Sequence, residues 1–148
     1  MSNEPNPLNI IKEQFKKDNY AKKFGIVLDS LSERSVKMHM ELTDEMNNLF
    51  ARPHGGAIYA LADAAFSVVG NNRNNLSVAL DCSISYHASP DPGKILYVEG
   101  ELVEQSRRIG TYLFNLYTQE NGVNQRVATM KSVLYRTGKP ISDDLPVK

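Results

Sequence analysis

The hydrophobic positions of the chain change their period along the sequence, and each period predicts an element. From Leu8 to about Tyr20 the apolar residues recur at helical spacing, which predicts a short amphipathic helix packed on something larger. A strand is expected from Phe24 to Leu31. A clearer strand runs from Arg34 to Leu42, where apolar and polar residues alternate as they do in a strand with one buried face. Residues 1–7 and 137–148, which contain prolines, are expected to be irregular tails.

The longest apolar run follows a connection rich in Asn, Asp and Pro. Gly56 to Val69 is predicted to form a helix that is apolar on most faces, and Gly70 with two following asparagines is typical of a helix C-terminus. Because a helix that is apolar nearly all round must be buried, this one should lie inside the fold. At 1.5 Å per residue it would span roughly 20 Å.

Four more strands are predicted after this helix. Turn residues at 90–93, 107–110 and 121–124 separate them, and such short links favour antiparallel pairing. The order of elements fits one curved antiparallel sheet wrapped around a central helix, with an unrelated α+β layer fold as the alternative. The expected strands are Ser77–Ala88, Lys94–Gln105, Gly110–Gln119 and Gln125–Arg136.

Composition adds constraints on partners and location. A chain of 148 residues with 41% hydrophobic and 23% charged residues is typical of one globular domain. Lysines plus arginines and acidic residues number 17 each, so no basic excess points to nucleic acid or to a membrane surface. No apolar stretch reaches the roughly 20 residues of a membrane helix, and the first residues lack the pattern of a signal peptide. We therefore expect no nucleic acid partner and no membrane partner.

Histidine and cysteine, the residue types that most often bind metals, are few and lie far apart in this sequence. Cys82 is the only cysteine, which excludes an internal disulfide and fits a reducing, cytoplasmic location. His39 and His87 have no partner at the spacing of metal ligands, so no metal site is predicted. The chain also lacks a Gly-x-Ser-x-Gly elbow and a phosphate-binding glycine-rich loop.

Asp63 is the one charge inside the apolar helix. It lies seven residues after Gly56, about two turns in, which is too far for a capping role. The residues three and four positions away carry no positive charge, so a helical ion pair does not account for it. Asp63 could be partly exposed or satisfied by another strand. It could instead face a cleft as a nucleophile or a general base.

The loop before the helix holds further polar candidates. The first N–H groups of a helix lack internal partners and carry partial positive charge, and glycines at 55 and 56 would let a ligand approach them. Such donors could form an oxyanion hole, which stabilises negative charge on a carbonyl oxygen. Taken alone, His54-Gly55-Gly56 could equally be a tight turn with a hydrogen-bonding histidine, and Asn48 an ordinary loop residue.

The combination of these residues resembles a known signature. Asn48, His54-Gly55-Gly56 and Leu61-Ala62-Asp63 resemble the "N-x5-HGG-x6-D" pattern of hotdog-fold thioesterases, the PaaI-like group in particular. The stretch VALDCSISYHASPDPG, residues 78–93, also resembles that family's third strand and its exit turn. The resemblance covers about residues 20–136. It implies a single α+β domain with the hotdog fold, in which an antiparallel sheet wraps a long central helix.

The resemblance also implies roles for the motif residues. Asp63 matches the family's catalytic carboxylate, which acts as nucleophile or as general base on water. Gly55 matches the glycine whose N–H polarises the thioester carbonyl, and Asn48 an asparagine that positions water or the carboxylate. His54 matches a histidine that supports the loop. In this family the glycine and asparagine of one chain face the aspartate of another in a homodimer, and two dimers commonly form a homotetramer.

The implied substrate is an acyl-CoA, with CoA as part of the substrate and no separate cofactor. Arg107 and Arg108 lie in the turn between the fourth and fifth strands, and they could bind CoA phosphates or be ordinary solvated residues. Some relatives carry Ser or Thr where Ala79 stands here. The period of two places Ser77 and Ser83 on one face of the same strand.

Gly56, Ser77, Ala79 and Ser83 complete the candidate substrate-binding set. The implied activity is hydrolysis of an acyl-CoA thioester to a carboxylic acid and CoA. A non-catalytic hotdog protein that binds acyl-CoA or an acyl carrier is the alternative. A hotdog dehydratase is a third interpretation, but it uses a different arrangement of histidine and acid.

The spacing of the two halves of the site favours a dimer by itself. Gly55 and Asp63 are eight residues apart, about 12 Å along a helix axis, and one carbonyl group cannot bridge that distance. If two copies of this helix lay antiparallel and side by side, Gly55 of one chain could lie next to Asp63 of the other.

Overall fold

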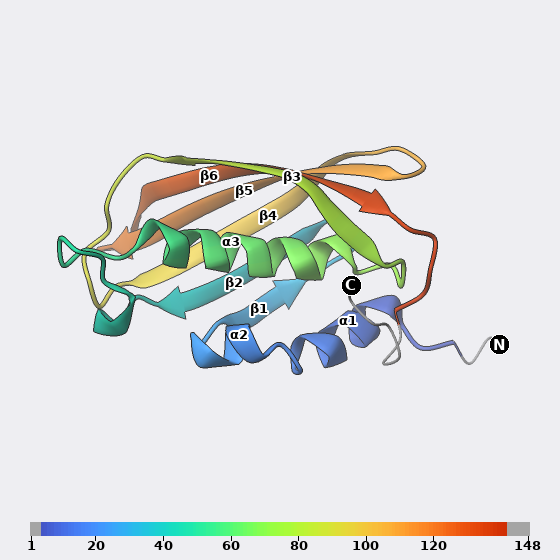
Figure 1. Cartoon of the computed structure of the whole chain (residues 1–148), viewed down its shortest axis with the longest axis horizontal. Helices are drawn as coiled ribbons and strands as arrows, with labels where there is room; N and C mark the ends of the chain where they lie inside the picture. The colour runs from blue at the N-terminus through green and yellow to red at the C-terminus, as the bar shows by residue number, and fades with distance from the viewer. Residues whose placement is uncertain (1–3, 142–148) are drawn as a thin grey trace.

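The computed structural model describes residues 4–141, which form one curved sheet with the longest helix on its concave side (Figure 1). The six strands pair antiparallel throughout, in the order β1-β2-β4-β5-β6-β3. The helical elements are α1 (Pro7–Phe15), α2 (Asn19–Lys23), the 3-10 turn η1 (Asp44–Met46) and α3 (Gly55–Gly70). The strands are β1 (Val27–Leu31), β2 (Ser35–Glu41), β3 (Ser77–Tyr86), β4 (Ile95–Gln105), β5 (Ile109–Glu120) and β6 (Val123–Arg136).

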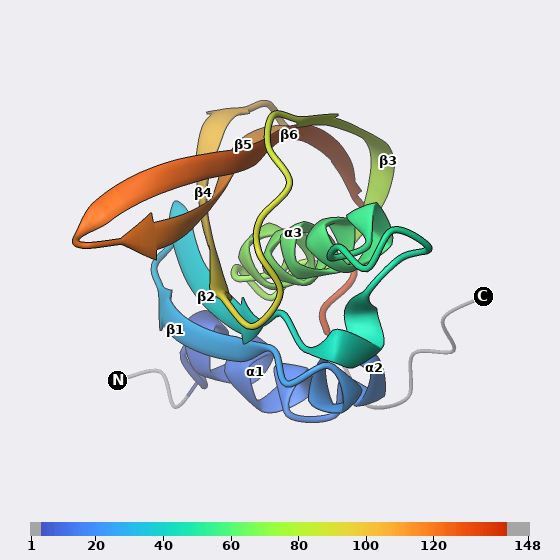
Figure 2. The ribbon, with the colours of Figure 1, turned by 90° about the vertical axis from the view of Figure 1, so that its left-hand side faces the viewer.

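The sheet curves around α3, as the view along the helix shows (Figure 2). The inward residues of the strands and most faces of α3 are buried together; Met38, Leu61, Tyr112 and Phe114 are all 1% exposed or less. Burial of this apolar surface is the main force that holds the helix in the sheet. The predicted helix wrapped by an antiparallel sheet is therefore confirmed.

Gly100 shows how closely the sheet and its neighbours pack. A Cβ atom at this position on β4 would lie 2.3 Å from the ring of Phe114, so only glycine leaves room for that ring. Phe114 in turn packs edge-on against Phe66 of α3, with ring centroids 5.8 Å apart. This contact helps to fix the rotation of α3 about its axis and hence the direction in which Asp63 points.

The strand β3 forms one edge of the sheet. It pairs only with β6, and within residues 4–141 no strand covers its other side. Three large apolar side chains of β3 are exposed, namely Val78, Leu80 and Tyr86. An uncovered edge with apolar side chains is a ready template for pairing with another chain.

The N-terminal region differs from the prediction of one helix over Leu8–Tyr20. The chain forms two helices, because the Asp18 side chain accepts a hydrogen bond from the Ala21 N–H at 2.9 Å and starts α2 anew. The strand expected from Phe24 begins only at Val27, since Gly25, with a φ of +66°, ends the helical region.

The predicted tails are partly within the described structure. Pro7 is the first residue of α1, so the expected N-terminal tail is shorter than predicted, and residues 1–3 lie outside the described range. Residues 137–141 are irregular as predicted, and 142–148 lie outside the described range. Within residues 4–141, no helix has both the length and the apolar character that crossing a membrane requires.

Candidate active site

The loop before α3 is folded around the side chain of Asn48. Its Oδ1 accepts hydrogen bonds from the N–H groups of Phe50, at 2.8 Å, and Arg52, at 3.2 Å. This turn puts Ala51 in the left-handed region, with a φ of +57°. Nothing in the described part of the chain accepts a hydrogen bond from the Asn48 Nδ2 group. The loop thus fixes the carboxamide of Asn48 and leaves its donor side available.

Arg52 ties this loop to the turn between β3 and β4. Its guanidinium donates to Ser89 Oγ at 3.1 Å, to the carbonyls of Ser89 and Pro90, both at 2.9 Å, and to Asp91 Oδ1 at 2.9 Å. A planar guanidinium with this many acceptors is a rigid brace. No sequence pattern indicates this role of Arg52, because the acceptors lie almost 40 residues away in the chain.

His54 caps the start of α3. Its Nδ1 accepts a hydrogen bond from the Gly56 N–H at 2.8 Å, so the ring nitrogen nearer the backbone is the unprotonated one. The predicted role of His54 as a support of the loop fits this contact. Gly56 was a candidate substrate-binding residue, but its N–H is already occupied by the cap.

Gly55 keeps an available donor at the same helix start. Within the described residues, no acceptor lies at hydrogen-bond distance from its N–H, whereas its carbonyl accepts from the Tyr86 hydroxyl at 3.0 Å. Gly55 borders a hollow of about 370 Å³ whose other lining residues include Pro53, Ile58 and Tyr86. A free N–H at a helix N-terminus, beside a hollow, has the properties of an oxyanion hole.

Asp63 is half-buried on α3, and nothing in the described part of the chain forms a hydrogen bond or an ion pair with its carboxylate. Burial raises the pKa of Asp63, and the negative charge of Asp18 raises it further. The residue borders a cavity of about 60 Å³, together with Phe66, Ser77 and Ala79. An unpaired carboxylate of raised pKa at a cavity is a candidate base or nucleophile.

The strand opposite Asp63 contains a β-bulge that corrects one sequence inference. The register of β3 against β6 shifts between Ala79 and Asp81, so Leu80 is the extra residue. Ser77 therefore pairs with the buried Arg136 and borders the Asp63 cavity, while Ser83 pairs with the exposed Lys131 on the other face. The prediction that Ser77 and Ser83 share a face is wrong, because the bulge reverses the alternation between them.

One hydrogen bond connects β3 to the start of α3, where the Tyr86 hydroxyl donates to the Gly55 carbonyl at 3.0 Å. Further along α3, burial raises the pKa of Tyr59 to about 12, and the neighbouring Cys82 of β3 contributes to this rise. Within one chain, Gly55 and Asp63 stay about 12 Å apart along the helix axis.

The remaining candidates lie away from both groups. Arg107 and Arg108 are exposed in the turn before β5, and neither borders the hollow at Gly55 or the cavity at Asp63. Arg108 donates to the Arg136 carbonyl at 3.3 Å and stacks over the Tyr135 ring at 5.6 Å. Their predicted contact with CoA phosphates remains a prediction.

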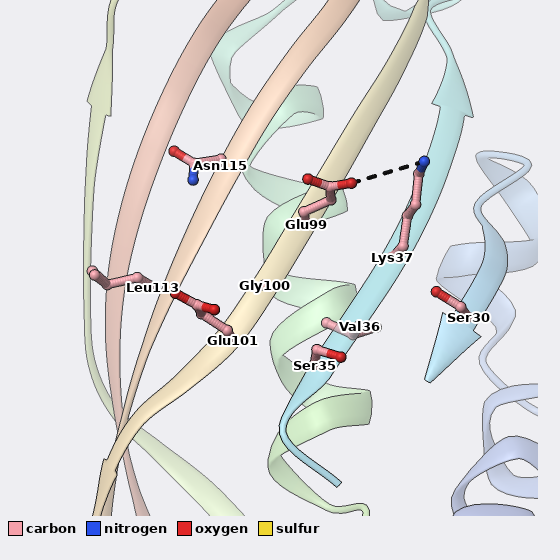
Figure 3. A pocket seen from close by; sticks show the side chains of 9 residues that line it. All are labelled: Ser30, Ser35, Val36, Lys37, Glu99, Gly100, Glu101, Leu113 and Asn115. Atoms are coloured by element: carbon pink, nitrogen blue, oxygen red, sulfur yellow. Dashed lines mark ion pairs between the residues drawn. The ribbon is translucent and has the colours of Figure 1, made fainter. Parts of the chain in front are cut away.

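A separate hollow of about 390 Å³ lies on the outer face of the sheet, away from α3 (Figure 3). Its lining is mainly polar and includes Lys37, Glu99, Glu101 and Asn115, with Lys37 and Glu99 paired at 3.8 Å. None of the candidate residues from the sequence lines it. Across the described range, no three His, Cys, Asp or Glu side chains gather in a group that could hold a metal ion.

The cap provides a first prediction. His54→Ala should lower the free energy of unfolding by about 0.5–2 kcal/mol, the usual effect of losing a side-chain cap, and His54→Asn should restore most of it. Urea unfolding followed by circular dichroism measures both. If His54→Ala leaves the stability unchanged but stops hydrolysis completely, the histidine takes part in the chemistry rather than in the cap.

The chain is similar in sequence to known proteins over the region that contains these residues. A family model described as "Thioesterase superfamily" matches residues 53–124, which include the cap, Gly55 and Asp63. The chain is 30% identical over 116 residues to a "Putative esterase" of Archaeoglobus fulgidus, covering 78% of this chain and 71% of that protein. The chain belongs to the thioesterase superfamily.

A further relative of this thioesterase-superfamily chain matches it in both sequence and structure. It is 27% identical over 130 residues to "Acyl-coenzyme A thioesterase PaaI" of Escherichia coli, covering 88% of this chain and 91% of that protein. The solved structure of the E. coli PaaI protein superposes with a TM-score of 0.85 at 25% identity, covering 92% and 97% of the two chains. The hotdog fold implied by the sequence is thereby confirmed.

A Streptococcus mutans protein, solved bound to acetyl CoA, shows what a similar fold can hold. It has a TM-score of 0.72 and 26% identity, and the superposition covers 78% of this chain and 91% of that one.

Proposed function

We propose that the protein is an acyl-CoA thioesterase whose active site is shared by two chains. The observation that carries the proposal is the pair of unsatisfied groups on α3. Gly55 has a free N–H at the helix start, and Asp63 has an unpaired, half-buried carboxylate two turns later. Hydrolysis of a thioester needs such a donor for the oxyanion and such a base or nucleophile. The relatives named acyl-CoA thioesterase or bound to acetyl CoA supply the substrate class.

The proposed reaction starts with the thioester carbonyl oxygen at the Gly55 N–H. Asp63 of the second chain then removes a proton from water as the water oxygen bonds to the carbonyl carbon. Alternatively, Asp63 attacks that carbon itself and forms an anhydride, which water later opens. In both routes the carbon–sulfur bond breaks, CoA leaves as the thiolate, and the acyl group ends as a carboxylate. Asn48, whose Nδ2 has no acceptor among the described residues, belongs to the loop that leads into the same helix and would orient the water.

A second chain would bring an Asp63 carboxylate close to the Gly55 N–H, which a single chain keeps apart from its own Asp63. If α3 of a two-fold related copy lay antiparallel beside α3 of the first chain, Asp63 of each chain would lie beside Gly55 of the other. The uncovered edge of β3 and its exposed Val78 and Leu80 offer a surface for that copy. We therefore propose a homodimer, and a homotetramer of two dimers, as the assembly that carries the activity.

A binding protein without catalysis is the second candidate. The observation that favours it is Ala79, which borders the Asp63 cavity with a methyl group and offers no hydroxyl to orient a water molecule. Ser77 borders the same cavity and could take this role.

The experiment is a thiol-release assay on a panel of acyl-CoA esters, together with sedimentation velocity. We expect turnover of at least one ester and a dimer or tetramer at micromolar concentration. Tight binding of acyl-CoA without turnover would support the binding protein instead. A monomer at that concentration that still hydrolyses acyl-CoA would rule out the shared site.

A further inference from the structure

The loop between η1 and α3 exposes two large apolar side chains to an unusual degree. Leu49 is 87% exposed and Phe50 is 74% exposed, more than the other exposed large hydrophobic residues of the described chain. Single exposed apolar side chains are common on proteins, whereas neighbouring exposed apolar side chains are a candidate binding surface.

This loop is held rigidly even though its tip is exposed. Asn47 and Pro53 form a β-bridge across its base, and Asn48 Oδ1 accepts the Phe50 N–H at 2.8 Å. Ala51 adopts a left-handed conformation, which costs free energy and persists only when the surroundings enforce it. With Arg52 anchored on the next turn, the backbone that carries Leu49 and Phe50 is held in place. A preorganised apolar pair of this kind loses little entropy on binding.

The cavity at Asp63 is too small to hold an acyl group by itself. Its volume is about 60 Å³, whereas pockets for small ligands usually enclose roughly 300–1,000 Å³. On β3 it is lined by the apolar Val78 and Ala79 beside Ser77, and Val78 is 46% exposed. A further surface must therefore complete the cavity before it can enclose an acyl chain.

The proposed dimer determines which part of the second copy can add this surface. If Gly55 and Asn48 of one chain lie at Asp63 of the other, then Leu49 and Phe50 reach the same place. They follow Asn48 directly in the chain, and the Phe50 N–H is bonded to its side chain. The two exposed side chains then meet the apolar rim around Ala79 and Val78 of the partner.

We propose that Leu49 and Phe50 are specificity-determining residues that complete the acyl pocket at Asp63 of the opposite chain. This inference rests on the proposed function, because it needs the same dimer. The occupant that fits is an uncharged, apolar acyl group of medium length, lying between Phe50 of one chain and the Val78 rim of the other. A short acetyl group would not reach these side chains.

The test uses Leu49→Ala and Phe50→Ala in the full-length protein, with Val123→Ala as a matched control. Val123 is 59% exposed in the β5–β6 hairpin, and Gly55 and Asp63 lie on other elements. Thioether analogues of acetyl-, hexanoyl- and decanoyl-CoA, which cannot be hydrolysed, are titrated calorimetrically. We expect each loop variant to weaken the hexanoyl and decanoyl analogues at least about tenfold and the acetyl analogue less than about twofold. The control should change none of them.

Each other outcome overturns a specific statement. An equal loss for all chain lengths would mean that the loop acts only through Asn48 or through the dimer contact, and the specificity role would be wrong. Unchanged binding of the long analogues would also overturn it. Thiol release by the wild-type protein tests the proposed function separately. If the wild type releases thiol but the loop variants do not change analogue affinity according to chain length, only this inference is refuted. If no analogue binds the wild-type protein, this inference fails, and the thiol-release assay still decides the proposed function.

Discussion

Asp63→Asn should lower kcat for acyl-CoA hydrolysis by at least about 10²–10⁴-fold while the dimer and the fold stay intact. The range is the usual contribution of a general base, and loss of a nucleophile would exceed it. Asparagine has nearly the same shape, and nothing in the described part of the chain bonds to the Asp63 carboxylate, so the substitution breaks no contact. Thiol release under saturating substrate measures kcat, and sedimentation verifies the assembly.

The same variant has a pH-dependent effect on stability. Burial raises the pKa of Asp63 above its ordinary value of 3.8, so the folded chain prefers the protonated carboxyl group. The stability that this preference provides is present at acid pH and is lost as the pH rises through the folded-state pKa. At pH 7 the ionised Asp63 therefore destabilises the fold, and Asp63→Asn should raise Tm. The difference should shrink as the pH falls through the folded-state pKa towards 3.8.

An exposed carboxylate serves as the control for the kcat measurement. Asp81 lies on β3, is exposed and does not border the Asp63 cavity, so Asp81→Asn should leave kcat unchanged. A variant Asp63→Asn that retains more than about a tenth of the wild-type kcat would remove this residue from the chemistry. The reaction would then need another base.

The sequence specified the main elements because their patterns are local. The alternation over Arg34–Leu42 reports one buried face, and β2 lies there with Val36, Met38 and Met40 buried. The apolar run after Gly55 requires burial on all sides, and only a sheet that wraps the helix provides it. The break at Asp18 was missed because a single capping side chain competed with a continuous helical pattern.

The features that the sequence could not specify depend on distant partners. The bulge in β3 reflects its pairing with β6, roughly 50 residues later, and a period-two argument cannot detect it. Asp63 and Gly55 stood out because a charge and a glycine pair are unusual at their positions. Leu49 and Phe50 carried no such signal. Their importance emerges only from their exposure on a braced loop beside a cavity that one chain leaves incomplete.

Gly55→Pro should lower kcat by about 10²–10³-fold, or about 2.7–4 kcal/mol in activation free energy, because it removes the N–H that stabilises the oxyanion. Proline is well tolerated at the first position of a helix. His54 already has the extended backbone that a following proline requires, with φ −64° and ψ 137°. No described residue accepts a bond from the Gly55 N–H, so the folded chain loses no hydrogen bond of its own.

Gly55→Ala separates the missing donor from the added side chain. It keeps the N–H and places a Cβ 3.4 Å from the Tyr86 ring, a contact that the proline variant shares. The alanine variant should therefore retain most of the kcat, while both variants unfold near the wild-type temperature. Equal losses in the two variants would assign the effect to crowding against Tyr86. A proline variant with normal kcat would show that the helix start holds no oxyanion, and the carbonyl would then have to be polarised elsewhere.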